Sequence, residues 1–446
     1  MKSYFETLSK NLFAALSPNE HLNISLQGDD TQFVRINGSK VRQSGVVENY
    51  YFSFLFISGS SEKALKSATG QITLSMDLKE DEAKVIQWIN RFREDLVHFP
   101  FDPYAELPKA QVQPSQSDTK GQLLARAAVV DELLTEAGTA DLAGLYSAGS
   151  VVRAMANSAG LFHWFATESF SFDYSLFTAG QKAIKTSYSG HEWSAQKYRT
   201  GLQSALAGLK QFQTPSRKLE RGDYRVYLAP AAFEDLVQMF SWHAVSEMAI
   251  RKSQSSFRYL RSGEKTLSEK FTLHEDFSGG EMPRFNQKGD LAPLKQTIIE
   301  KGKLKTTLIN ERTAMEFGIK SNAANTGENL RSPVVDKGDL QESEILKRLG
   351  TGLYLSNLHY LNWSDESNGR ITGMTRYACF WVENGQIVAP IDNLRFDESV
   401  FDLFGNSLEA LTDFDEYHAV TRSYSNREIG GARTPGALLS KMHFSL

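Results

Sequence analysis

One stretch of the chain, Tyr224–Glu247, joins a strand pattern directly to a helix pattern, and it constrains the fold more than any other. Residues 224–229 alternate as in a strand, and Pro230 then stands where proline suits the first turn of a helix. Residues 231–250 contain neither glycine nor proline, and apolar side chains recur there at helical spacing. The pattern predicts one continuous helix over this range. Its polar face carries little obvious chemistry.

The rest of the chain indicates an α+β fold with several domains, because 446 residues exceed one ordinary core. Polar connections suggest segments at 1–110, 118–212 and 218–446. The first two are expected to form an N-terminal α/β region, a mixed sheet with helices. The third is expected to be a mostly antiparallel β domain with helices, since its strand signals are short and its turns rich in glycine. Within it, Asn384-Gly385 predicts a two-residue hairpin.

The N-terminal region shows separate strand and helix signals. Short strands are expected at 23–27, 32–38, 41–44 and 50–56, and helices at 4–16, 77–98 and 196–209.

Composition excludes several classes of protein. A net charge of −4 and a pI near 6.2 argue against a general nucleic-acid surface. No apolar run reaches the length of a membrane span, and the N-terminus lacks the apolar core of a signal peptide. The single cysteine, Cys379, excludes an intrachain disulfide framework. We therefore expect a cytoplasmic protein that contacts neither membrane nor nucleic acid.

Several sequence blocks together resemble the TldD/TldE (PmbA) family, which includes proteins once described as modulators of DNA gyrase and understood as peptide-processing metalloproteases. The resemblance spans nearly the whole chain and depends on the order and spacing of the blocks. They are Phe33–Gly38, Phe101–Pro108, Val152–Gly160, Gly222–Pro230, Ile299–Leu304, Ala314–Thr326, Thr372-Gly373 and Val382–Gly385 followed by Pro390.

The resemblance implies two kinds of subunit. The TldD-like kind carries His-Glu-x-x-x-His on the helix after the strand matched by Val226–Pro230, with a cysteine near the C-terminus as third zinc ligand. An ungapped match places Gln238 and Met239 at the first histidine and the glutamate, and only His243 retains its ligand type. The matching C-terminal position falls in Gly430–Gly436, which has no cysteine.

A hydrolytic zinc site needs about three protein ligands and a general base. Glutamine is a poor zinc ligand and methionine cannot act as a base, so we assign this chain no catalytic residues and no metal ligands. It resembles the TldE/PmbA kind. The resemblance implies a dimer, either with itself or with a TldD-like subunit that holds the zinc, acting on unfolded peptides.

Two other functions stay open. His243 and Glu247 are four residues apart, so on a continuous helix both could face a metal in an active metallopeptidase with a rearranged site. A hydrogen-bonded surface pair of His243 and Glu247 is the more ordinary interpretation.

Cys379 is interpreted as a buried apolar side chain rather than a nucleophile. The third candidate is a non-enzymatic regulatory protein of the gyrase-modulator type.

A polar loop supplies the candidate residues for peptide binding. The stretch 321–329 contains many small donors and acceptors, and in the family the corresponding loop borders the cleft. Asn325, Thr326 and Gly327, with His243, are therefore the candidate peptide cleft. An ordinary solvent loop explains the composition equally well.

Overall fold

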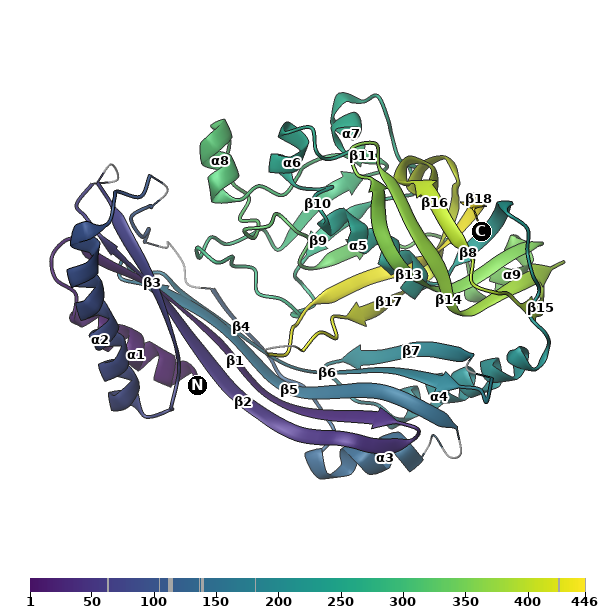
Figure 1. Ribbon diagram of the computed structural model, residues 1–446, viewed down its shortest axis with the longest axis horizontal. Coiled ribbons are helices and arrows are strands. Elements are labelled where there is room, and N and C mark those ends of the chain that lie inside the picture. The colour runs from purple at the N-terminus through teal and green to yellow at the C-terminus, as the bar shows by residue number, and fades with distance from the viewer. Residues whose placement is uncertain are drawn as a thin grey trace.

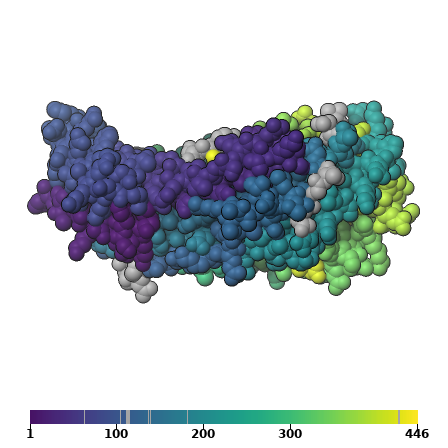
Figure 2. All heavy atoms as spheres, turned by 90° about the horizontal axis from the view of Figure 1, so that it is seen from below, coloured from purple at the N-terminus to yellow at the C-terminus, as the bar shows by residue number. Residues whose placement is uncertain are grey.

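The computed structural model describes residues 1–61, 64–103, 105–110, 115–135, 137, 140–180, 182–423 and 426–445. A long, bent N-terminal sheet runs along the molecule, and the C-terminal domain lies on one side of it (Figure 1). Seen from below, the body is elongated, and the N-terminal residues run from one end of it past the middle (Figure 2). The expected α+β fold is confirmed.

The N-terminal sheet, in the part of the chain described, has seven strands in the order β3-β2-β1-β5-β6-β4, with β7 also paired to β6. All its pairings are antiparallel except the parallel pair of β4 and β6, so the sheet is mixed as expected. Its strands come from both N-terminal segments, 1–110 and 118–212, except that β4 begins at Ser115, between the two. They are β1 (Glu20–Asn37), β2 (Lys40–Ser58), β3 (Lys66–Thr73), β4 (Ser115–Thr119), β5 (Asp141–Asn157), β6 (Phe162–Phe177) and β7 (Ala183–Gly190).

Several expected short strands are continuous strands in the structure. The patterns at 23–27 and 32–38 belong to β1, and those at 41–44 and 50–56 belong to β2. Gly28, Asp29 and Asp30 between the first two patterns stay in register with Tyr50, Asn49 and Glu48. The prediction of separate strands was wrong because pairing along the whole length overrides the local turn signal.

Side-chain alternation gives the two faces of this sheet different neighbours. Even-numbered residues of β5 and β6 such as Val152, Trp164 and Phe172 pack in cores with the helices α1–α4. Odd-numbered Met155 and Phe165 pack with Phe285 of the C-terminal domain. These helices are α1 (Lys2–Ala14), α2 (Leu78–Asp95), α3 (Val129–Thr135) and α4 (Ala195–Leu209).

The C-terminal domain is built on a second, larger sheet that is mostly antiparallel. Only the pairs β8–β13 and β12–β18 are parallel among the described ladders, and β8 also pairs with β18, so the sheet closes on itself. The hairpin of β14 and β15 turns at Asn384-Gly385, both with positive φ (52° and 76°), as predicted. The strands are β8 (Gly222–Leu228), β9 (Leu273–Asp276), β10 (Lys295–Glu300), β11 (Lys303–Leu304), β12 (Pro333–Val335), β13 (Gly352–Asp365), β14 (Arg370–Glu383), β15 (Gln386–Pro390), β16 (Arg395–Ser399), β17 (Leu408–Ala419) and β18 (Gly431–Phe444).

Short helices complete this domain. They are α5 (Pro230–Gln238), α6 (Glu247–Arg251), α7 (Arg258–Ser262), α8 (Glu311–Phe317) and α9 (Ile345–Leu349). Helix α5 buries Phe233, Leu236 and Val237 in the main core of the domain. In the part of the chain that is described, no helix combines the length and apolar character that crossing a membrane requires.

The continuous helix expected over 231–250 is broken. Helix α5 ends at Gln238, one 3₁₀ turn follows (η4, Met239–Ser241), and the chain then forms a bridge between Ser246 and Leu308. The amide of Glu247 donates to the Leu308 carbonyl at 3.0 Å, and the Ser246 hydroxyl caps α6 by accepting from the Ala249 amide at 3.1 Å. Pairing with a distant segment therefore replaces the helical hydrogen bonds.

Candidate functional site

His243 lies in the turn between η4 and α6, outside the helix in which Glu247 lies. Its backbone has a positive φ of 68°, outside any helix. The imidazole is 65 % exposed, and its Nδ1 lies 3.0 Å from a carboxylate oxygen of Glu366. The prediction that His243 and Glu247 share one helix face was wrong, because the helix that would align them does not exist.

Glu247 is instead enclosed by hydrogen-bond donors. Its carboxylate accepts from Arg251 Nε at 2.6 Å, from Thr307 Oγ1 at 2.6 Å and from Arg261. Burial alone would raise the pKa of Glu247, but the hydrogen bonds from Arg261, Thr307 and Arg251 outweigh it and hold the pKa below its usual value. The carboxylate is thus committed to an internal ion-pair network.

The polar loop containing Asn325, Thr326 and Gly327 is attached to the segment that follows His243. Its anchor is Glu328, whose carboxylate accepts from the Ser246 hydroxyl at 2.5 Å and the Met248 amide at 3.0 Å. Within the loop, Asn325 Oδ1 accepts from the Asn329 amide at 2.8 Å. The loop is therefore near the turn that carries His243, and these four residues stay a predicted peptide-binding surface.

The residues at the zinc-motif positions do not fit a zinc ion. Met239 is 2 % exposed and packs in the core of the C-terminal domain. The Gln238 side chain is hydrogen-bonded to Glu234, and His243 pairs with Glu366. Among the residues that the structure describes, no three His, Cys, Asp or Glu side chains are grouped so that they could hold a metal ion.

Cys379 lies on β14 and is 3 % exposed. Its thiol points at the Arg376 carbonyl, 3.2 Å away, and burial raises its pKa to about 11. A nucleophilic cysteine needs a lowered pKa and access to solvent. The structure thus confirms the expectation of a buried, apolar-type side chain.

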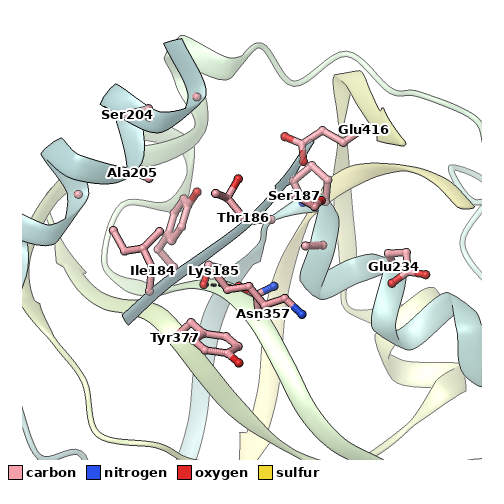
Figure 3. A pocket seen from close by; sticks show the side chains of 18 of the residues that line it. Ile184, Lys185, Thr186, Ser187, Ser204, Ala205, Glu234, Asn357, Tyr377 and Glu416 are labelled. Atoms are coloured by element: carbon pink, nitrogen blue, oxygen red, sulfur yellow. Dashed lines mark hydrogen bonds between the residues drawn. The ribbon is translucent and has the colours of Figure 1, made fainter. Parts of the chain in front are cut away.

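A large cavity lies elsewhere, between the N-terminal sheet and the C-terminal domain. This cleft has a volume of about 950 Å³ and is bordered by β7 and α4 on one side and by α5, β13, β14 and β17 on the other. Figure 3 shows Lys185 of β7, Glu234 of α5, Asn357 of β13 and Glu416 of β17 around it. None of the four residues predicted as a peptide cleft lines this cavity.

Helix α5 turns its polar face into the cleft. Because Phe233, Leu236 and Val237 enter the core, Glu234 and Asp235 are left on the opposite side, where they line the cavity. Burial raises the pKa of Glu234 to about 8, and the charge of Asp235 adds to the shift. Burial likewise raises the pKa of Asp235 to about 6, against a hydrogen bond from the Leu358 amide at 3.1 Å.

The cleft also holds basic groups. Lys185 forms an ion pair with Asp173 at 3.2 Å, and although burial opposes it, this neighbour raises the pKa of the lysine. Burial lowers the pKa of His418 to about 4 and, with Arg376 and Lys185, also lowers that of His359. Both imidazoles are thus neutral near pH 7.

The residues that line the cleft were not predicted from the sequence. The one available signal was the adjacent pair Glu234-Asp235 on the helix face opposite the apolar stripe, which was interpreted as carrying little chemistry. The sequence could not show that this pair faces a cleft, because the opposite wall is β7, more than forty residues earlier in the chain.

Comparison with known proteins gives a family match and shared folds. The model of the PmbA/TldA metallopeptidase C-terminal domain matches residues 221–446. No curated protein matches the chain. A candidate modulator of a DNA gyrase from Thermotoga maritima has a TM-score of 0.79 at 14% identity, covering 99% of this chain and 100% of its own.

Two further solved structures agree. TldE from Thermococcus kodakarensis has a TM-score of 0.77 at 14% identity, over 99% of this chain and 100% of its own. A candidate modulator of DNA gyrase from Bacteroides thetaiotaomicron has a TM-score of 0.72 at 16% identity, over 100% of this chain and 98% of its own. Identities this low establish a common fold and nothing more.

Proposed function

The chain belongs to the PmbA/TldD metallopeptidase family, and we propose that it is a TldE/PmbA-type subunit without a catalytic zinc of its own. In this proposal it associates with a TldD-like subunit that carries the zinc. The pair acts in the cytoplasm on unfolded peptides, processing or degrading them, and this chain helps to enclose the substrate.

One observation carries the proposal: the side chains at the positions of the zinc motif are committed to other contacts. Met239 is a core residue, so restoring a glutamate there would bury a charge among apolar side chains. Gln238 bonds to Glu234, and His243 is turned to Glu366. A site that activates water for hydrolysis needs ligands and a base at these places.

The test is reconstitution with the TldD-like protein encoded in the same genome. We expect a stable complex by size exclusion with light scattering, and peptide cleavage that needs both chains and is abolished by a chelator. The matched control is a TldD-like chain with its motif glutamate replaced by glutamine, which should still associate but not cleave. Absence of any association would refute the proposal.

Metal content of the chain alone separates the remaining alternatives. We expect no stoichiometric zinc after mild purification. About one zinc per chain, with chelator-sensitive cleavage by the chain alone, would instead identify an active metallopeptidase with a rearranged site. Two fold relatives carry a gyrase-modulator description, and partners in pull-downs that do not change when the TldD-like gene is deleted would favour such a regulatory role.

A further inference from the structure

The cleft between the two sheets has an unbalanced set of charges. Its described lining contains five carboxylates and one ammonium group, a formal charge of −4 with neutral histidines. They are Asp173, Glu234, Asp235, Glu342, Glu416 and Lys185. Lys185 forms its ion pair with Asp173, so among the described lining residues the other four carboxylates have no lysine or arginine in ion-pair contact.

The two carboxyl groups on α5 show the consequence of this imbalance. Glu234 and Asp235 are adjacent, burial disfavours the ionisation of both, and the charge of Asp235 further disfavours that of Glu234. Lys185 attracts both carboxylates, but burial outweighs this attraction and the pKa of each stays raised. A further cation beside them would add to the attraction, and low local dielectric makes such an attraction strong. The cleft is therefore electrostatically complementary to a positive group.

A second, independent feature is the unpaired ring nitrogen of His418. Its Nε2 is buried and has no hydrogen-bond partner among the described residues, and the nearest carboxylate oxygen, on Glu416, is 3.8 Å away. Buried polar atoms are normally satisfied, so an unsatisfied one in a cavity wall indicates a missing partner. A neutral imidazole nitrogen can accept a hydrogen bond from an ammonium, a guanidinium or a peptide N–H.

The shape and the rest of the lining suit a peptide. The volume of about 950 Å³ is near the top of the range of roughly 300–1,000 Å³ for ligand pockets. Tyr354, Phe380 and Ile387 add an apolar wall on the C-terminal domain. Such a wall can hold the aliphatic stem of a long basic side chain while its charged end meets the carboxylates.

We propose that this cleft binds a basic segment of an extended peptide, with a lysine or arginine side chain between Glu234 and Asp235 and a donor of the same segment on His418. The peptide nature of the ligand rests on the function proposed above. The charge selection rests on this chain alone, so it can be tested without a partner subunit.

The test is calorimetric titration of the full chain with capped, unfolded peptides of identical length. One has Lys-Gly-Arg at its centre, and the matched ones have Gln-Gly-Gln or Glu-Gly-Glu. We expect the basic peptide to bind at least about tenfold more tightly than the neutral one. Equal affinity for all three would overturn the proposal, as would spermidine binding as tightly as the basic peptide. Neither result would bear on association with a TldD-like subunit.

Single substitutions test whether Glu234 and Asp235 bind the basic peptide. E234Q and D235N should each lower the affinity for the basic peptide by about tenfold or more and leave the affinity for the neutral peptide unchanged. The matched control is E264Q, an exposed glutamate outside the cleft, which should bind like wild type. Unchanged affinity in correctly folded E234Q and D235N would refute the assignment.

A pH series gives a readout that needs no variant. Because a bound cation favours the ionised carboxyls, binding near pH 7 should release protons, and affinity should rise between pH 6 and 8. Lys185 and His359 line the same cleft, and burial, with the charges of Arg376 and Lys185, holds the pKa of His359 below its usual value. Proton uptake on binding would contradict the proposal.

Discussion

Replacing Glu247 by glutamine is expected to lower the free energy of unfolding by about 3 kcal/mol. The wild-type carboxylate is 4 % exposed and accepts from Arg251, Arg261 and Thr307. Removing one partner of a buried ion pair costs about 3–5 kcal/mol. The lower end applies because the arginines are 36 % and 38 % exposed and can be rehydrated, and because glutamine keeps one oxygen acceptor.

Urea unfolding followed by tryptophan fluorescence measures this loss. With a slope of about 3 kcal/mol per molar urea, the midpoint should fall by roughly 1 M. The matched control is H243Q, because the His243 side chain is exposed and pairs with the surface residue Glu366, and it should change stability by at most about 0.5 kcal/mol.

The pH dependence supplies a second check. Since the pKa of Glu247 is lower in the folded protein than the ordinary value of 4.5 for a glutamate, its stabilisation is complete above that value and is lost as pH falls through the folded-state pKa. The difference between wild type and E247Q should therefore shrink below about pH 4.5. A loss under about 1 kcal/mol at pH 7, or a midpoint raised by zinc in wild type but not in E247Q, would refute the structural role.

Three further predictions concern buried groups. Arg427→Met should destabilise by about 3 kcal/mol in urea unfolding, since the guanidinium donates to the Ser169 carbonyl at 2.9 Å and hydroxyl at 3.0 Å and methionine leaves them unpaired; an unchanged midpoint would contradict this. Cys379 should react with a thiol reagent at pH 8 at least about a hundredfold faster after unfolding, and rapid labelling of the native protein would show that its pKa is not raised. His418, whose pKa is lowered to about 4 in the folded state, should reduce stability as pH falls from about 6.5 towards 4, because the unfolded chain binds the proton first; His418→Gln should flatten that part of the stability profile, and a profile like that of wild type would contradict the argument.

The strand-to-helix junction was predictable, whereas the end of the helix was not. Alternation up to Leu228 and the proline at 230 locate β8 and the start of α5, because both signals are local. The break after Gln238 depends on Leu308, which pairs with the chain at Ser246 although it is about sixty residues away in sequence. The helical spacing of apolar residues is a local pattern, so it cannot show that a distant segment will replace the helical hydrogen bonds.

The same limit explains the N-terminal strands. Gly28-Asp29-Asp30 is a typical turn sequence, yet Asp29 lies inside β1 and is 2 % exposed. One of its carboxylate oxygens accepts from the Arg427 amide at 3.0 Å. A contact supplied by the C-terminal domain thus helps to keep a turn-forming sequence in a strand.

That contact also connects stability to the cleft. Arg427 belongs to the loop between β17 and β18, and its side chain holds this loop on the N-terminal sheet through Ser169. Strand β17, directly before the loop, carries Glu416 and His418 into the cleft. Loosening the loop should therefore shift these two groups relative to Lys185 on β7. We expect Arg427→Met to lower both the affinity for the basic peptide and the stability of the fold. Glu247→Gln should destabilise the domain without changing that affinity, because the hydrogen-bond network of Glu247 is away from the cleft lining.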